Sequence, residues 1–185
     1  MKNFDEVMMR TAYEWAIESY CKRGKVGAIL SREGRIVTNG YNGTISGMCN
    51  DCEDEFIKCR KCSSDNPLNR NNIYLDSVHI YKFICTECYA KHDYSDMDEL
   101  EAVIELKTNQ FTLHAEQNLI AFAAKYGIAT AGCTLYTTKS PCKECSKLIA
   151  QSGIVRVVYD EEYHDTAGID FLRKVGVLVD KLERK

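Results

Sequence analysis

Residues 114–159 read HAEQNLIAFAAKYGIATAGCTLYTTKSPCKECSKLIAQSGIVRVVY, and this stretch decides the fold. Apolar side chains at helical spacing predict one helix over 114–126 and a second over 141–151. Short runs rich in β-branched and aromatic residues predict strands at 134–138 and 155–159. Strands that alternate with helices of this length are typical of a layered α/β domain that has helices on both faces of its sheet.

The flanking segments extend this pattern. Residues 4–21 place apolar side chains at spacings of three and four, which predicts a helix with one apolar face. Residues 26–30 and 35–41 read as a hairpin whose connection, 31–34, is rich in turn-forming residues. A last helix and strand are expected to end near Val179. We therefore expect a three-layer α/β/α fold around a central sheet.

The central chemical signal is H-A-E at 114–116, followed by P-C-x-x-C at 141–145. One imidazole from His114 and two thiolates from Cys142 and Cys145 would leave a tetrahedral zinc with one position open for water, as a catalytic zinc site requires. The alternative is a structural zinc site closed by a fourth ligand such as Cys133. A structural site would give the acidic residue of H-A-E no role, so the sequence favours a catalytic site.

The helices predicted over 114–126 and 141–151 are both expected to begin beside this metal. Ser140 suits an N-cap and Pro141 a first helical position, which would place both cysteines in the first turn of their helix. Two thiolates cancel the charge of zinc, which by itself would weaken its ability to acidify water. The dipoles and N–H groups of two helix N-termini would compensate by favouring thiolates and hydroxide.

Glu116 lies two residues after the histidine, which is about 200° around a regular helix. It therefore cannot share the direction of the imidazole unless the segment begins irregularly. We expect it to act as a neighbour of the metal: it would take a proton from the bound water and pass it to the substrate ring.

Length and charge limit the partners. The 185 residues suit one domain over 1–185 that buries roughly 70% of the surface of its unfolded chain. Lys and Arg number 24 against 27 Asp and Glu, which leaves no excess of basic charge for long nucleic acid or an anionic membrane. The sequence contains neither a signal-peptide core nor an apolar run of about 18 residues. We expect a soluble, cytoplasmic protein that acts on a small molecule.

A cysteine-rich insertion is expected over 44–109, where apolar periodicity is lost. Twenty-two residues lie between the pair Cys59 and Cys62 and the pair Cys85 and Cys88, which is the spacing of a four-cysteine zinc ribbon. With nothing that indicates secretion, metal thiolates explain paired cysteines better than disulfides. The sequence thus predicts at least one structural zinc ion besides the catalytic one.

A third pair, Cys49 and Cys52, cannot join the same tetrahedral ion. It could bind a further zinc with Cys21, His79 or His92. The alternative for these last three residues is a buried thiol and two imidazoles that bind no metal.

A nucleic-acid-binding role for the ribbon is the competing interpretation of the insertion. Acidic runs at 53–55 and 96–99 would repel phosphates, so a structural role is favoured.

The motifs resemble a known family. HAEQN and SPCKEC resemble the zinc signature of the cytidine deaminase superfamily. The resemblance to deoxycytidylate deaminases is narrower and covers roughly residues 5–43 and 110–180. It is carried by KVGAIL at 25–30, NGYNG at 39–43, HAEQN at 114–118, SPCKEC at 140–145 and IAQSGIVRVVY at 149–159. It implies a cytidine-deaminase-like fold with a mixed sheet, and zinc-dependent deamination of dCMP to dUMP for thymidine nucleotide synthesis.

The resemblance also implies roles for individual residues. Asn42 would contact the substrate sugar, Glu116 would shuttle protons and Tyr163 would lie near the substrate phosphate. Arginines such as Arg156 have no context that distinguishes them from solvated surface charges.

Regulation is implied in the same way: a homohexamer, activation by dCTP and inhibition by dTTP, with Mg²⁺ accompanying the triphosphate. The effector residues would be Lys25, Gly40, Tyr41 and Gly43. For this segment a plain turn is the alternative, because Asn-Gly tolerates positive φ. For Lys25 the alternative is a solvated charge.

Other activities stay open at this point. The superfamily signature alone also permits a deaminase of free cytidine, of dCTP or of adenosine in transfer RNA. A zinc-ribbon nucleic-acid-binding protein on an inactive deaminase scaffold is the alternative from another class of proteins.

Overall fold

The computed structural model describes residues 4–58, 65–67 and 103–183. The chain divides into two compact units, Met1–Cys52 together with Phe111–Lys185, and Glu53–Gln110. The second unit overlaps the segment 44–109 that the sequence sets apart as an insertion.

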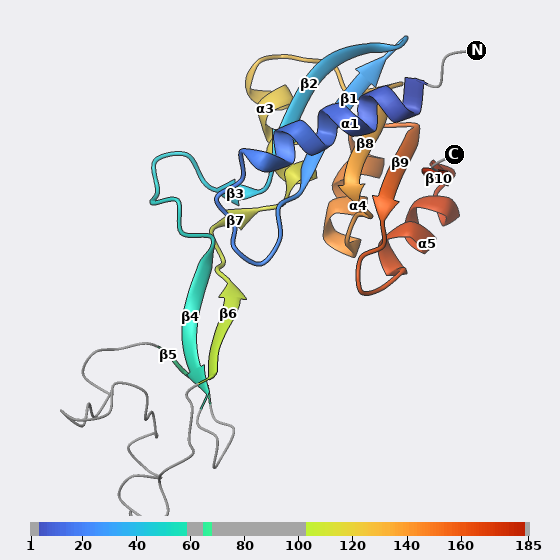
Figure 1. Cartoon of the computed structure of the whole chain (residues 1–185). Coiled ribbons are helices and arrows are strands. Elements are labelled where there is room, and N and C mark those ends of the chain that lie inside the picture. The colour runs from blue at the N-terminus through green and yellow to red at the C-terminus, as the bar shows by residue number, and fades with distance from the viewer. Residues whose placement is uncertain (1–3, 59–64, 68–102, 184–185) are drawn as a thin grey trace, which may run out of the picture. The chain divides into compact units, whose positions relative to one another are not determined.

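The first unit is built on a five-stranded sheet of order β10-β9-β8-β1-β2 (Figure 1). β1 pairs antiparallel with both β2 and β8, whereas β8–β9 and β9–β10 are parallel pairs. The parallel pairs require crossovers, and helices α4 and α5 supply them. The bounds are β1 Gly27–Arg32, β2 Arg35–Tyr41, β8 Thr134–Lys139, β9 Arg156–Glu161, β10 Leu178–Lys181, α4 Lys143–Gln151 and α5 Ala167–Lys174.

Both faces of this sheet are covered, because successive strand residues point to opposite sides. α1 (Phe4–Ile17) packs Met8, Met9 and Ala12 on one face, against Ile29, Tyr136 and Val158. The opposite face buries Leu30, Leu135 and Val157 with apolar residues of α3 (Ala115–Lys125), α4 and α5. Figure 1 shows α1 crossing the sheet over β1 and β8. The three-layer α/β/α arrangement with a mixed sheet is therefore confirmed.

The β1–β2 hairpin forms as predicted. Glu33 and Gly34 both have positive φ, at 52° and 74°. Two consecutive left-handed residues make the turn type whose twist matches that of antiparallel strands. The pairing register shifts between Leu30 and Ser31, so the hairpin contains a bulge.

α1 is shorter than the sequence predicts, since it ends at Ile17 rather than near residue 21. Lys25 Nζ donates to the carbonyl of Ile17 at 2.9 Å, and Ser19 Oγ donates to the carbonyl of Asn42 at 2.7 Å. These tertiary hydrogen bonds hold the chain after Ile17 in a loop. No helix among the described residues has the length and apolar character needed to cross a bilayer.

The second unit contains a three-stranded antiparallel sheet of order β5-β4-β6. Its strands are β4 Glu53–Lys58, β5 Asp65–Pro67 and β6 Val103–Thr108. The four cysteines of the expected zinc ribbon, Cys59, Cys62, Cys85 and Cys88, lie outside the described residues, as do His79 and His92.

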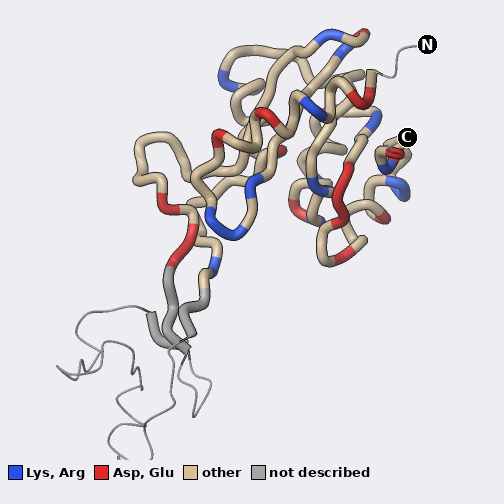
Figure 2. The backbone as a smooth tube through the Cα atoms, viewed as in Figure 1, with Lys and Arg blue, Asp and Glu red and all other residues tan. Residues whose placement is uncertain are grey.

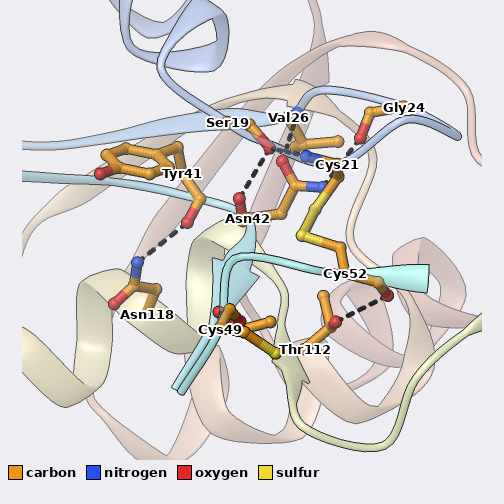
Figure 3. Close-up of a disulfide and its surroundings, with 11 residues drawn as sticks. Ser19, Cys21, Gly24, Val26, Tyr41, Asn42, Cys49, Cys52, Thr112 and Asn118 are labelled. Atoms are coloured by element: carbon orange, nitrogen blue, oxygen red, sulfur yellow. Dashed lines mark hydrogen bonds between the residues drawn. A yellow bond between two sulfur atoms is a disulfide. The ribbon is translucent and has the colours of Figure 1, made fainter. Parts of the chain in front are cut away.

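The expected pairing of Cys49 with Cys52 on one metal ion is not formed. Cys52 is bonded to Cys21 in a disulfide, whereas Cys49 is a free, exposed thiol (Figure 3). Cys52 is 1% exposed and its carbonyl accepts a hydrogen bond from Thr112 Oγ1, which holds this residue beside the strand β7 (Thr112–Leu113). Sequence spacing points to Cys49 as the partner, but the fold places Cys21 beside Cys52.

Candidate active site

Three side chains with metal-ligating atoms meet at the starts of α3 and α4. The ligating atoms of His114, Cys142 and Cys145 all lie within 4.8 Å of one another. His114 Nδ1 is 3.5 Å from the sulfur of Cys142 and 3.4 Å from that of Cys145. A tetrahedral zinc with ordinary bond lengths separates nitrogen and sulfur by about 3.6 Å. The donor set and its spacing therefore fit zinc with an open fourth position.

Both helices begin directly after a ligand residue. His114 has φ −70° and ψ 159°, and Cys142 has φ −70° and ψ 169°, so both are extended N-cap residues. The sulfur of Cys142 caps α4 by accepting from the N–H of Cys145 at 3.5 Å. The ligands thus stand where the N–H groups and positive dipole ends of two helices converge.

The expectation that Ser140 caps α4 is wrong, because Cys142 takes that position. Ser140 instead accepts a hydrogen bond on its hydroxyl from the N–H of Tyr163 at 2.7 Å and donates its own N–H to Glu161 at 2.8 Å. These bonds tie Ser140, which lies two positions before the N-cap Cys142, to the end of β9.

The two thiols differ in acidity. The hydrogen bond from Cys145, together with that from His114, lowers the pKa of Cys142 to about 4 against its burial. The pKa of Cys145 is raised by the neighbouring Cys142 and by burial. The two thiols share a proton through this contact, and a cation bound between them would favour the thiolate form of both.

Glu116 is 3% exposed in the first turn of α3. Burial raises the pKa of its carboxyl, while its own backbone N–H and the imidazole of His114 act in the opposite direction. The side chain lies beside Cys145 as well. The irregular start that the sequence requires for such a position is present, because His114 is extended rather than helical.

Cys133 does not join these residues. It is buried, and its sulfur lies 3.8 Å from the carbonyl of Ala129. Within the described parts of the chain, the group that could hold a metal consists of the histidine and the two cysteines alone. A structural site closed by Cys133 is therefore not formed.

Asn42 ties together the loop that follows α1 (Figure 3). Its side-chain oxygen accepts from the N–H of Val26 and its side-chain nitrogen donates to the carbonyl of Gly24, both at 2.8 Å. The role in sugar binding that the resemblance implies is therefore accompanied by a structural one.

The four effector residues expected from the resemblance have structural contacts of their own. Gly40 lies in β2, and a Cβ there would come within 2.7 Å of the carbonyl oxygen of Ala115, so this strand packs closely on α3. Tyr41 accepts from Asn118 through its carbonyl, and its ring stacks with Trp15. Gly43 begins the short strand β3 (Gly43–Thr44), which pairs with β7 (Thr112–Leu113).

The alternative of a plain turn at this segment is wrong, because neither Gly40 nor Gly43 has a positive φ. Lys25 is not merely a solvated charge, since it binds the last carbonyl of α1.

Tyr163 lies close to the metal-ligating residues. Its N–H binds Ser140, and its ring is 5.8 Å from Nζ of Lys139. Burial raises the pKa of its phenol, and the charge of Cys142 adds to the effect.

Sequence reasoning missed two structural groups. Arg156 is not a plain surface charge, because both of its terminal nitrogens bind Asp5 of α1, at 3.0 and 2.9 Å. Gln117 accepts from the N–H of His114 at 2.9 Å. Its position, three residues after the N-cap, is the capping-box position, so that pattern could have identified it.

The fold and the His/Cys/Cys group define a zinc-binding deaminase. The family described as the cytidine and deoxycytidylate deaminase zinc-binding region matches residues 2–161. The chain belongs to this family, and the resemblance drawn from its motifs is confirmed.

Within this family, the chain is similar to proteins named deoxycytidylate (dCMP) deaminases. The chain is 32% identical over 180 residues to the deoxycytidylate deaminase of Enterobacteria phage T4, covering 96% of this chain and 89% of the phage protein. It is 29% identical to human deoxycytidylate deaminase, over 87% of this chain and 67% of the human one. The crystal structure of cyanophage S-TIM5 dCMP deaminase in complex with dCMP and dUMP has a TM-score of 0.67 at 34% identity and covers 98% of each chain.

Proposed function

We propose that this protein catalyses the hydrolytic deamination of dCMP to dUMP and ammonia. The observation that carries the proposal is the buried carboxyl of Glu116 beside a cluster of one imidazole and two thiols. Relatives named deoxycytidylate deaminase, and a similar structure that holds dCMP and dUMP, support the substrate.

His114, Cys142 and Cys145 would hold the zinc ion. When bound, zinc polarises and acidifies the water that becomes the nucleophile. Glu116 would then move the protons: it takes one from the water and gives it to the ring nitrogen next to the amino-bearing carbon. The oxygen of the water would add to the amino-bearing carbon as the ring nitrogen is protonated. The remaining proton of that oxygen would then pass through Glu116 to the amino group, the carbon–nitrogen bond would break, and ammonia would leave with the oxygen kept as the carbonyl of dUMP.

Burial of Glu116 suits this role. A carboxyl whose pKa is raised toward neutrality holds a proton more readily than an exposed one, so it can act as base and then as acid in the same turnover. The convergence of two helix N-termini offsets the negative charge that two thiolates and a carboxylate bring to the site.

Substrate recognition by Asn42 and Tyr163 forms part of the proposal. The amide of Asn42 has two N–H groups and two acceptor lone pairs, so a sugar hydroxyl can be bound in addition to Gly24 and Val26. Tyr163 would reach the phosphate from the segment that follows β9.

We further propose an assembly, a mode of regulation and a second metal site for this protein. These are a cytoplasmic homohexamer, control by dCTP and dTTP with Mg²⁺ through Lys25, Gly40, Tyr41 and Gly43, and a structural zinc held by Cys59, Cys62, Cys85 and Cys88.

The distribution of charged residues in the protein supports a small-molecule substrate. In the described part of the chain, Lys and Arg residues are interspersed with Asp and Glu (Figure 2). Such a mixture gives little electrostatic attraction for a long phosphate backbone.

The test is deamination by the purified, zinc-loaded protein, followed by ultraviolet absorbance. We expect Glu116→Gln to lower kcat with dCMP by about 10²–10⁴-fold and to leave the zinc content unchanged. Wild-type protein should also prefer dCMP to deoxycytidine. Equal turnover of the nucleoside would remove the nucleotide assignment, and full activity in the variant would remove the proposed mechanism.

A further inference from the structure

The two ligand helices start in the same way but are capped differently. In α4 the ligand Cys142 caps the helix itself, because its sulfur accepts the N–H of Cys145. In α3 the ligand His114 directs Nδ1 at both sulfurs. A neutral imidazole has one acceptor lone pair, and a metal at Nδ1 would use it. The side chain of His114 also accepts the backbone N–H of Gln117 in a capping box, so a metal at the ring would compete for that lone pair.

Gln117 forms the other half of this capping box. Its side-chain oxygen accepts the N–H of His114 at 2.9 Å, across the corner where β7 ends and α3 begins. This hydrogen bond fixes the backbone of residue 114 relative to the first turn, and the backbone direction determines where the ring can point. A second bond, from the N–H of Asn118 to the carbonyl of His114, holds the other side of the same residue.

We propose that Gln117 is a positioning residue for the metal ligand His114. It acts through the ligand backbone and touches neither metal nor substrate. Loss of its acceptor allows residue 114 to rotate at the corner, so that the imidazole spends less time directed at the two sulfurs. The consequence is weaker metal binding as well as a less stable helix start.

The test compares metal affinity in the wild type and three variants. Gln117→Met keeps the side-chain length and removes the acceptor, whereas Gln117→Glu keeps the acceptor in a capping-box residue. Gln151→Met, at the exposed last position of α4, is the matched control. We expect Gln117→Met to weaken zinc binding about tenfold in competition with a chelator, as the loss of a group that orients a ligand does. Gln117→Glu and Gln151→Met should stay within about threefold of the wild type.

A cobalt(II) titration gives a readout that a merely structural cap would not change. The thiolate-to-cobalt absorption band should be weaker and saturate at higher metal concentration in Gln117→Met and recover in Gln117→Glu. Gln117→Ala, which favours the helix, gives the same comparison should the methionine variant fold poorly. Equal metal affinity in Gln117→Ala and wild type would overturn the proposal.

The inference rests on the proposed metal site but not on the proposed substrate, since metal binding is measured without any nucleotide. A wild-type protein that shows no thiolate band would instead contradict the metal site itself. Inactivity of the loaded wild type toward dCMP would leave the inference standing.

Discussion

The positions of His114 and Cys142 depend on close contacts with neighbouring residues that have no reactive group. Gly168, buried in the first turn of α5, lies directly against the loop that presents Cys142. A Cβ on Gly168 would be 2.0 Å from the carbonyl oxygen of Pro141 and 2.9 Å from the carbonyl carbon of Cys142. This glycine has no positive φ, so the space around it, rather than its backbone conformation, requires a hydrogen as side chain.

We predict that Gly168→Ala destabilises the protein by about 1–3 kcal/mol, because the loop or the helix must move to admit the methyl group. In a helix without that obstacle, the same substitution would stabilise by up to about 1 kcal/mol. Urea unfolding therefore tests the sign as well as the size.

Gly24→Ala is the control for this substitution, since nothing lies within 4 Å of a Cβ at that position. We expect it to change the free energy of unfolding by at most about 1 kcal/mol. A stabilised Gly168→Ala protein would show that α5 does not press on the ligand loop.

At the scale of elements, α1 is joined to the sheet by polar contacts as well as by its apolar face. Asp5 accepts two hydrogen bonds from Arg156 of β9 and one from the hydroxyl of Tyr136 of β8, at 2.8 Å. The bidentate geometry fixes the angle of the helix on the strands. Arg156 also binds Asp180 of β10 at 2.7 Å, so three strands share this group of contacts with α1.

This cluster predicts that the free energy of unfolding depends on pH in the acidic range. The hydrogen bonds from Arg156 and Tyr136 hold the pKa of Asp5 below its ordinary value of 3.8, against burial. As the pH falls, the unfolded chain takes up this proton before the folded one does. The stabilisation is therefore complete above about pH 4 and is lost as the pH falls through the lower folded pKa.

The corresponding measurement is urea unfolding of Asp5→Asn and wild type at pH 7, 5 and 3. We expect the variant to be about 1 kcal/mol less stable at pH 7 and the difference to shrink at pH 3. Asp180→Asn should cost less, because the side chain of Asp180 is 51% exposed whereas that of Asp5 is 26% exposed. A constant difference across the three pH values would contradict the role of Asp5.

At the scale of the whole molecule, the site joins elements that are far apart in sequence. His114 precedes α3, which packs on β1 and β2, while the cysteines open α4 in the crossover from β8 to β9. A metal ion held by both helices would bind the folded state only, because the unfolded chain does not bring these residues together. Its binding free energy therefore adds to the stability of the first unit.

We predict that removing zinc with a chelator lowers Tm by about 5–10 °C, which corresponds to metal present at about a hundred times its dissociation constant. With zinc bound, His114→Ala should have a lower Tm than the wild type. Its Tm should also fall less on chelation, since any other bound zinc is present in both proteins and contributes equally to the two falls. An equal fall in the two proteins would locate the stabilising metal away from this site.

The order of the helices and of the five strands of the main sheet follows from the sequence, because each of these elements carries its own periodicity and turn residues, as in the hairpin at Glu33 and Gly34. The short strands β3 and β7 carry no such signal, so the sequence does not predict them. The sequence also identified the three residues that the structure brings together as a group able to hold a metal, since HAE and PCxxC combine a donor set and a spacing that few other chemistries need. The tertiary structure alone decided that Cys52 meets Cys21, that α1 ends at Ile17 and that Arg156 binds Asp5. The physical reason is the distance along the sequence over which each signal acts. Periodicity and capping act over a few residues, whereas the paired residues are 31 to 151 positions apart and the end of α1 depends on a distant loop. Only tertiary packing brings such residues together.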